Sequence, residues 1–147
     1  MKGWITLADF AEVHAGKLFI VGGGIYLVGP GPVSMGVAAE VLVPWEDRSK
    51  RLDLRLALMD GNGRPFMAPT SVGVVQAPLE VGARFEVVPS PGTPAGAQLP
   101  FAFAFYMANV PLPPDTYEWH LFIEREDAPA ARKAFTVRSA APQTATQ

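Results

Sequence analysis

Cysteine is absent from this chain of 147 residues. Its absence excludes disulfides, a cysteine nucleophile and every zinc site that needs sulfur ligands. Positive charge is also scarce: 12 lysines and arginines stand against 14 acidic residues, and the densest basic group is only Arg48, Lys50 and Arg51. A phosphate backbone requires a larger basic surface. We therefore expect no nucleic-acid partner.

Long apolar runs are missing too, and histidines are few. No run approaches the roughly 20 apolar residues of a membrane span. Asp9 interrupts the first apolar stretch before it reaches the length of a signal peptide. We expect a cytoplasmic protein that does not associate with membranes. The two histidines, His14 and His120, are too few for a metal site of the cupin type, which requires several.

Helix signals are almost absent. The chain has 14 glycines and 15 prolines, spaced so that few windows of a dozen residues could hold a continuous helical pattern. The exception is residues 9–15, DFAEVHA, where the Asp9 side chain could accept hydrogen bonds from free amides at a helix start. This segment predicts one short accessory helix.

Strand signals are plentiful. Leucines occupy every second position from Leu52 to Leu58, the alternation of a half-buried strand, and the same period runs from Tyr117 to Ile123. Further predicted strands are Trp4–Ala8, Lys17–Val28, Val33–Val43, Ser71–Ala77, Ala83–Val88, Leu99–Ala108 and a closing strand with Phe135 and Val137. About eight short strands between Gly and Pro turns predict an all-β fold, an antiparallel β-sandwich of immunoglobulin-like or jelly-roll-like type.

The chain length suits one domain, which we place at residues 1–138. No linker or internal repeat interrupts this stretch. Residues 139–147, SAAPQTATQ, are small and polar. We expect them to form a disordered tail, because they offer no large side chain for docking.

Three consecutive glycines, Gly22 to Gly24, stand between two apolar runs. A dinucleotide-binding loop needs a third glycine where this chain has Leu27, and a helix after it. The following residues, IYLVGPGP, are unsuited to starting a helix that could hold a phosphate. We therefore expect no nucleotide or other cofactor, and interpret the glycines as a bulge or bend inside a long strand, or as room for a neighbouring ring.

Asp9, Glu12 and His14 are candidate metal ligands, because two carboxylates and an imidazole suit a hard or borderline divalent ion. On a helix, however, His14 would point away from the other two. The alternative is a capped, solvated turn, and we expect no metal. His120 is expected to be an exposed histidine on a strand. No serine or cysteine lies in a nucleophile-like turn, so the sequence suggests no catalytic residue.

Some predicted strands are apolar on both faces, notably residues 99–108 with phenylalanines on one side and alanines and Tyr106 on the other. A sandwich strand should have one solvated face. Either the accessory helix or the Pro-rich loop at residues 89–100 covers the second face, or that face is an association surface. If they are exposed in the fold, the interface candidates are the aromatic residues Trp4, Trp45, Tyr106 and Phe122.

Several segments, taken in order, resemble a small uncharacterised bacterial family catalogued as a domain of unknown function. They are LADFAEVHAGKLFIVGGG, VPWED, LRLALMDGNGRPF, LPFAFAF and PLPPDTYEWHLFIE followed by FTVR. The resemblance covers nearly the whole chain except the tail. It implies a bacterial, cytoplasmic protein of β-sandwich type, and it supplies no catalytic residue.

Two functional hypotheses follow. The first is a non-enzymatic β-sandwich binding or interaction module that associates with copies of itself, or with an unidentified protein partner, through an outer sheet face or edge. The second is a small-molecule-binding or metal-assisted enzyme with a site near Asp9, Glu12 and His14. A carbohydrate-binding role is a third alternative that rests only on the content of tryptophan and tyrosine.

Overall fold

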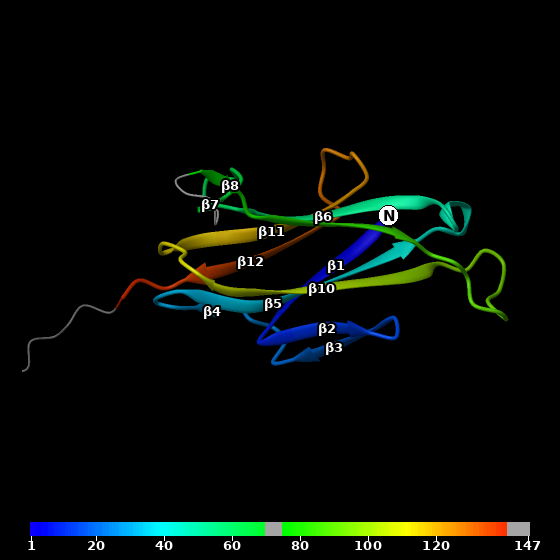
Figure 1. The fold of residues 1–147 in the computed structure, drawn as a ribbon, viewed down its shortest axis with the longest axis horizontal. Coiled ribbons are helices and arrows are strands. Elements are labelled where there is room, and N and C mark those ends of the chain that lie inside the picture. The colour runs from blue at the N-terminus through cyan, green and yellow to red at the C-terminus, as the bar shows by residue number, and fades with distance from the viewer. Residues whose placement is uncertain (70–74, 141–147) are drawn as a thin grey trace, which may run out of the picture.

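The computed structural model describes residues 1–69 and 75–140, which form twelve strands and one short 3-10 helix (Figure 1). The strands are β1 (Lys2–Ala8), β2 (Phe10–His14), β3 (Lys17–Val21), β4 (Leu27–Val28), β5 (Val33–Val43), β6 (Arg51–Met59), β7 (Met67–Pro69), β8 (Gln76–Pro78), β9 (Glu80–Glu86), β10 (Leu99–Val110), β11 (Asp115–Ile123) and β12 (Ala131–Val137). The helix is η1 (Trp45–Asp47). Within these described residues, no helix has the length and apolarity needed to cross a membrane.

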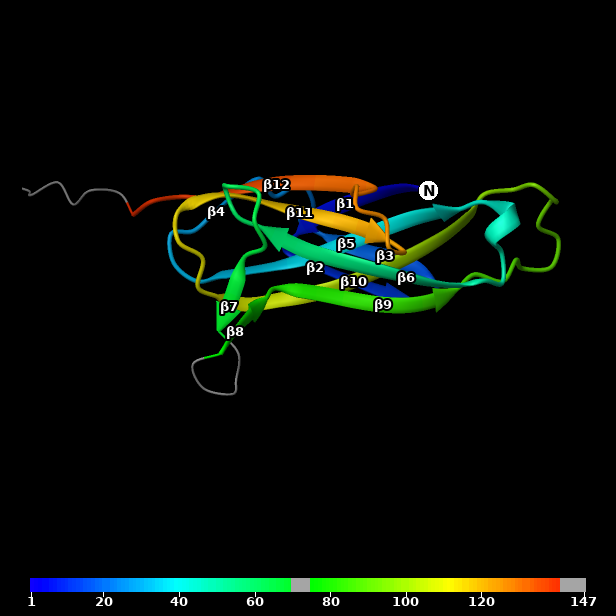
Figure 2. The same ribbon diagram turned by 90° about the horizontal axis from the view of Figure 1, so that it is seen from above.

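Two sheets form the body of the molecule. One has the order β1-β5-β10 and is wholly antiparallel, and the other has the order β4-β12-β11-β6-β9, with only β4 and β12 parallel. They lie one above the other in Figure 1, and in Figure 2 the long strands of both sheets run roughly along the long axis of the molecule. A continuous apolar core lies between them. The all-β class is therefore confirmed, and the sheets do not close into a barrel.

The alternation seen in the sequence determines which side chains enter this core. Leu52, Leu54, Leu56 and Leu58 are all buried, as the period of two predicts. On the neighbouring strand β11, Trp119 is completely buried and its ring meets Phe105 of the opposite sheet edge-on, with ring centres 5.4 Å apart. These contacts join the two sheets through large apolar side chains.

A corner before β11 fixes the entry of that strand. The Tyr117 hydroxyl donates a hydrogen bond of 2.6 Å to the carbonyl of Pro113, the arrangement known as a tyrosine corner in immunoglobulin-like sandwiches. The ring stacks on Phe135, with centres 5.7 Å apart. Burial raises the pKa of Tyr117, and the negative charges of Asp115 and Asp60 raise it further.

The prediction of an accessory helix at residues 9–15 is wrong. Its residues form strand β2, which pairs with β3 in a hairpin. The two-residue turn consists of Ala15 (φ 50°) and Gly16 (φ 74°), and positive φ at both positions is the signature of the type I′ turn that favours tight hairpins. Strand pairing with the apolar segment KLFIV outweighs the weak helix preference of DFAEVHA, because a helix this short cannot satisfy its own amides.

The hairpin forms a third layer on the outer face of the three-stranded sheet, away from the five-stranded sheet (Figure 1). It sits very close to β5 at Gly36, where a Cβ atom would lie 2.5 Å from the amide nitrogen of Ala11. Ala8, Ala38 and Ala11 are buried around this point. Small side chains here allow one backbone to lie almost directly on another.

One further strand prediction is wrong, a second lies mostly outside the described residues, and the predicted number of strands is too low. The single strand predicted over Lys17–Val28 is two strands, β3 and β4, because the chain leaves the hairpin at Gly22. The strand predicted over Ser71–Ala77 lies mostly at residues 71–74, outside the described residues, and β8 begins at Gln76. The predicted count of about eight therefore becomes twelve, chiefly through short hairpin strands. Within the predicted tail, only residues 139 and 140 are described, and neither belongs to a strand.

Candidate functional site

The three candidate metal ligands do not form a site. Asp9 lies at the bend between β1 and β2, where its carboxylate contacts Gly22. Glu12 and His14 lie on β2 and are exposed, and the His14 ring packs edge-on against Phe19 at 6.3 Å between centres. Across residues 1–69 and 75–140, no three His, Asp or Glu side chains gather in a way that could hold a metal ion. The geometry gives the metal-assisted enzyme hypothesis no support.

The three glycines bend the backbone, but they end β3 rather than interrupt a long strand. Gly22 has φ of 65° and Gly24 has φ of 92°, conformations that other residues rarely adopt. The Gly24 and Ile25 amides both donate to the Leu7 carbonyl, at 2.9 and 3.1 Å, which ties the returning chain to β1. No helix follows them. Their role is to bring the chain from the hairpin back to the body of the molecule.

The four interface candidates divide into two pairs. Trp4 and Tyr106 are each 49% exposed, and both lie on the outer face of the three-stranded sheet. Phe122, on the outer face of the other sheet, is only 7% exposed, because Arg55 lies over its ring at 4.3 Å and Ala57 and Met59 pack beside it. The prediction required these residues to be exposed, so this burial removes Phe122 from the candidates.

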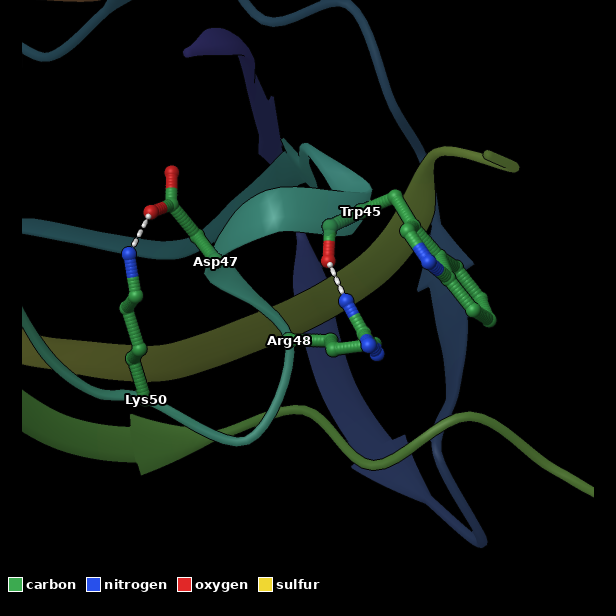
Figure 3. A network of polar contacts seen from close by, with 4 residues as sticks. All are labelled: Trp45, Asp47, Arg48 and Lys50. Carbon is green, nitrogen blue, oxygen red and sulfur yellow. Dashed lines mark hydrogen bonds and ion pairs between the residues drawn. The ribbon is translucent and has the colours of Figure 1, made fainter. Parts of the chain in front are cut away.

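Trp45 is also partly covered. It begins helix η1 and packs against the core. The Arg48 guanidinium lies 4.6 Å from the ring centre and donates a hydrogen bond of 2.9 Å to the Trp45 carbonyl, while Lys50 pairs with Asp47 at 2.8 Å (Figure 3). These contacts hold Trp45 in place, and Trp45 fixes the connection between β5 and β6 to the core.

We call the outer side of the three-stranded sheet, together with the hairpin on it, the hairpin side. Its exposed large apolar residues are Trp4, Phe10, Val13, Phe19, Ile20, Val21 and Tyr106. The Phe10 and Tyr106 rings lie 6.1 Å apart and connect the hairpin to β10. The hairpin covers part of the second apolar face of β10, so that Ala102 and Ala104 are half-buried. The hairpin thus covers apolar side chains of β10 but exposes apolar side chains of its own to solvent.

We call the outer face of the five-stranded sheet the charged side. Arg84 on β9 pairs with Asp53 on β6 at 2.8 Å, and Arg55 on β6 pairs with Glu80 on β9 at 3.2 Å. The hydrogen bond from Arg84 to Asp53 raises the pKa of Arg84. Each pair crosses between adjacent strands, as opposite charges do on a solvated sheet face. Here, solvent-facing positions carry charge rather than apolar area.

A hollow of about 500 Å³ lies at one end of the charged side, lined by Glu118 and His120 among other residues. The His120 side chain is only 14% exposed, so the prediction of an exposed histidine is wrong. Its Nε2 atom shares a hydrogen bond of 2.6 Å with Glu118. On the same face, the hydroxyl groups of Thr116 and Thr136 form a hydrogen bond of 3.1 Å. In the described part of the chain, Glu118 is the side chain that hydrogen-bonds this histidine, and no serine or threonine hydroxyl does, so His120 is not paired with a nucleophile.

The sequence interpretation missed the residues that dominate the hairpin side: Phe10, Phe19 and Val21. Two signals could have found them. FAEVH and KLFIV are short, rich in β-branched and aromatic residues, and exactly two residues separate them, the second a glycine. In addition, a helix confined to residues 9–15 would be too short to be stable alone, which argues for a strand.

Comparison with known proteins identifies the family of the chain. A model of a family of unknown function, DUF6941, matches residues 3–138. The chain belongs to this family. No curated protein matches the chain. The family assignment confirms the resemblance found in the sequence, and the all-β structure agrees with the β-sandwich character that it implied.

Proposed function

We propose that this DUF6941 protein is a non-enzymatic interaction module whose copies associate through the hairpin side. One observation supports this most strongly. Seven large apolar side chains are exposed on one side of the molecule, and they come from the neighbouring strands β1, β2, β3 and β10. Clustered exposed apolar residues of this kind mark interaction surfaces in soluble proteins.

The chemistry of the residues supports the same proposal. Four of the seven are aromatic, and aromatic side chains supply much of the binding energy of protein interfaces because they bury a large area at low entropic cost. Trp4 and Tyr106, two of the residues selected from the sequence, are among them. On the charged side, by contrast, Arg55 and Arg84 already have carboxylate partners within the chain.

Sedimentation velocity over a range of protein concentrations tests the proposal. We expect the unmodified chain to sediment as an oligomer, and Tyr106→Glu to sediment as a monomer, because a charge in an apolar interface must lose its hydration. Tyr26→Glu is the matched control: Tyr26 is 73% exposed but lies outside the hairpin side. The control should associate like the unmodified chain.

A monomer at every concentration would overturn the proposal. Equal loss of association in both variants would also contradict it, because added charge alone would then account for the effect. Circular dichroism and thermal unfolding of each variant establish that the fold is retained before the sedimentation results are compared.

A further inference from the structure

Strand β10 leaves one edge of the three-stranded sheet open. It pairs with β5 along one edge, and no described strand pairs with the other. Its sequence, LPFAFAFYMANV, has no charged residue over twelve positions. Unpaired amides and carbonyls on a long, uncharged edge are a template for pairing with another strand.

The other edges of the two main sheets, β1, β4 and β9, are protected. β9 carries Glu80, Arg84 and Glu86 along its length. β1 carries Lys2, and its Leu7 carbonyl is already occupied by the returning chain. β4 has only two residues. Charges, short length and internal coverage are the usual devices that prevent pairing between edges, and β10 has none of them between Phe101 and Met107.

The core-facing side chains of β10 also favour an added strand. Phe101, Phe103 and Phe105 are only partly buried, although they contact the core, because the sandwich is open beside this edge. Phe101 stacks on Phe85 of β9 with ring centres 3.9 Å apart, and Phe105 packs on Trp119. A strand added to β10 would shield the remaining exposed part of these rings.

The regular part of β10 is complementary to itself. Its pairing with β5 is continuous from Leu99 to Met107 and then shifts in register. The midpoint of that stretch is Phe103. In an antiparallel pair about a twofold axis at Phe103, Phe101 lies opposite Phe105 and Ala102 lies opposite Ala104. Phenylalanines then meet on the core face and alanines on the outer face, without a charge on either strand.

We propose that two copies pair β10 with β10 about this axis. The pairing makes one continuous six-stranded sheet, three strands from each copy, with both hairpins on its outer face. The inference rests on the proposed function, because it assumes that copies associate, and it places their contact at the open β10 edge that borders the hairpin side. It commits to a second copy rather than a foreign strand because the regular stretch of β10 is symmetric in residue type about Phe103, so the same strand of another copy supplies the matching phenylalanines and alanines.

Disulfide cross-linking tests the register, since the chain has no cysteine of its own. Ala102→Cys and Ala104→Cys are prepared separately in the full-length chain and mixed. Cross-strand cysteines in an antiparallel pair lie within disulfide reach. We therefore expect the mixture to form covalent dimers at least about tenfold faster than either variant alone, or than Ala134→Cys on the charged side, because pairing raises the local thiol concentration.

Sedimentation of the unmodified chain is measured first, so that the two proposals fail separately. If the chain is oligomeric but the mixture cross-links no faster than Ala134→Cys, the β10 pairing is wrong while association through another part of the hairpin side stands. If Val21→Cys, on the outer surface of the hairpin, cross-links fastest, the axis lies at the hairpin and the β10 pairing is again wrong. A monomeric chain overturns both proposals.

Discussion

The two outer sides of the molecule differ in what covers their outward-facing side chains. On the charged side, ion pairs cross from β6 to β9, and the Phe122 ring lies beneath Arg55 and beside Met59. On the hairpin side, part of the sheet is covered by two more strands of the same chain, and those strands expose Phe19 and Val21 instead.

The difference shows how a sequence-level ambiguity is resolved in space. Both sides contain aromatic residues at outward positions, so that counting aromatic residues does not separate them. Burial by a neighbouring arginine makes Phe122 a structural residue, whereas Phe19, with the His14 ring against it, remains 48% exposed. The contrast between the charged side and the hairpin side can be tested by substitutions whose expected effects on stability range from large to small.

The contrast predicts opposite consequences for two phenylalanines. Phe122→Ala should lower the free energy of unfolding by about 2 to 3 kcal/mol, because it removes a buried ring and its contacts with Met59 and Arg55. Phe19→Ala should cost less than about 1 kcal/mol, since its ring is half-exposed. Sedimentation should show the reverse order: Phe19→Ala weakens association and Phe122→Ala does not. Urea unfolding measures the first effect, and the contrast breaks if both variants behave alike.

Two glycines test how each side is packed. Gly36→Ala should destabilise the chain by about 2 kcal/mol, because the new Cβ meets the Ala11 backbone and pushes the hairpin from the sheet. The matched change on the charged side is Gly82→Ala, whose Cβ would meet nothing closer than the Leu54 carbonyl at 3.5 Å. It should be neutral or slightly stabilising.

Urea unfolding at equal protein concentration measures both glycine variants. Dye binding then reports whether the outer face of β10 becomes exposed in Gly36→Ala. Equal stability of the two alanine variants would show that the hairpin packs loosely, which would weaken the three-layer description of the hairpin side.

Tyr117 belongs to neither outer side and gives an internal reference. Because burial, with Asp115 and Asp60, raises its pKa above the unfolded value near 10, its contribution to stability is complete below about pH 10 and is lost as the pH rises through the folded pKa. Tyr117→Phe should cost about 1 kcal/mol at neutral pH through the lost hydrogen bond to Pro113. It should also flatten the decline above pH 10. An unchanged alkaline profile would mean that another group causes the decline.

The smallest effect is expected from a single ion pair on the charged side. Glu80→Gln should change the free energy of unfolding by less than about 0.5 kcal/mol, because its pair with Arg55 is half-exposed on both sides. The difference from the unmodified chain should vanish in 1 M salt, where charges are screened over roughly 3 Å. A larger loss that persists in salt would indicate that Glu80 supports the position of Arg55 over Phe122.

The sequence allowed prediction of the core but not of the outer layer. The leucines of β6 and the large residues of β11 follow a strict period of two, so their burial was predictable from the pattern alone. The hairpin was not, because a five-residue segment such as FAEVH fits a helix turn as well as a strand until its partner is known. Phe122 and His120 were misassigned for a related reason: an outward position on a strand does not reveal which long side chain covers it.

Hydrogen exchange measured at low and high protein concentration tests the central claim most directly. If the hairpin side is the association surface and β10 its axis, amides in residues 99–107 should gain protection as the concentration rises, and those of β6 and β9 should not. Concentration-dependent protection of residues 51–59 and 80–86 instead, or no change anywhere in the chain, would contradict the account.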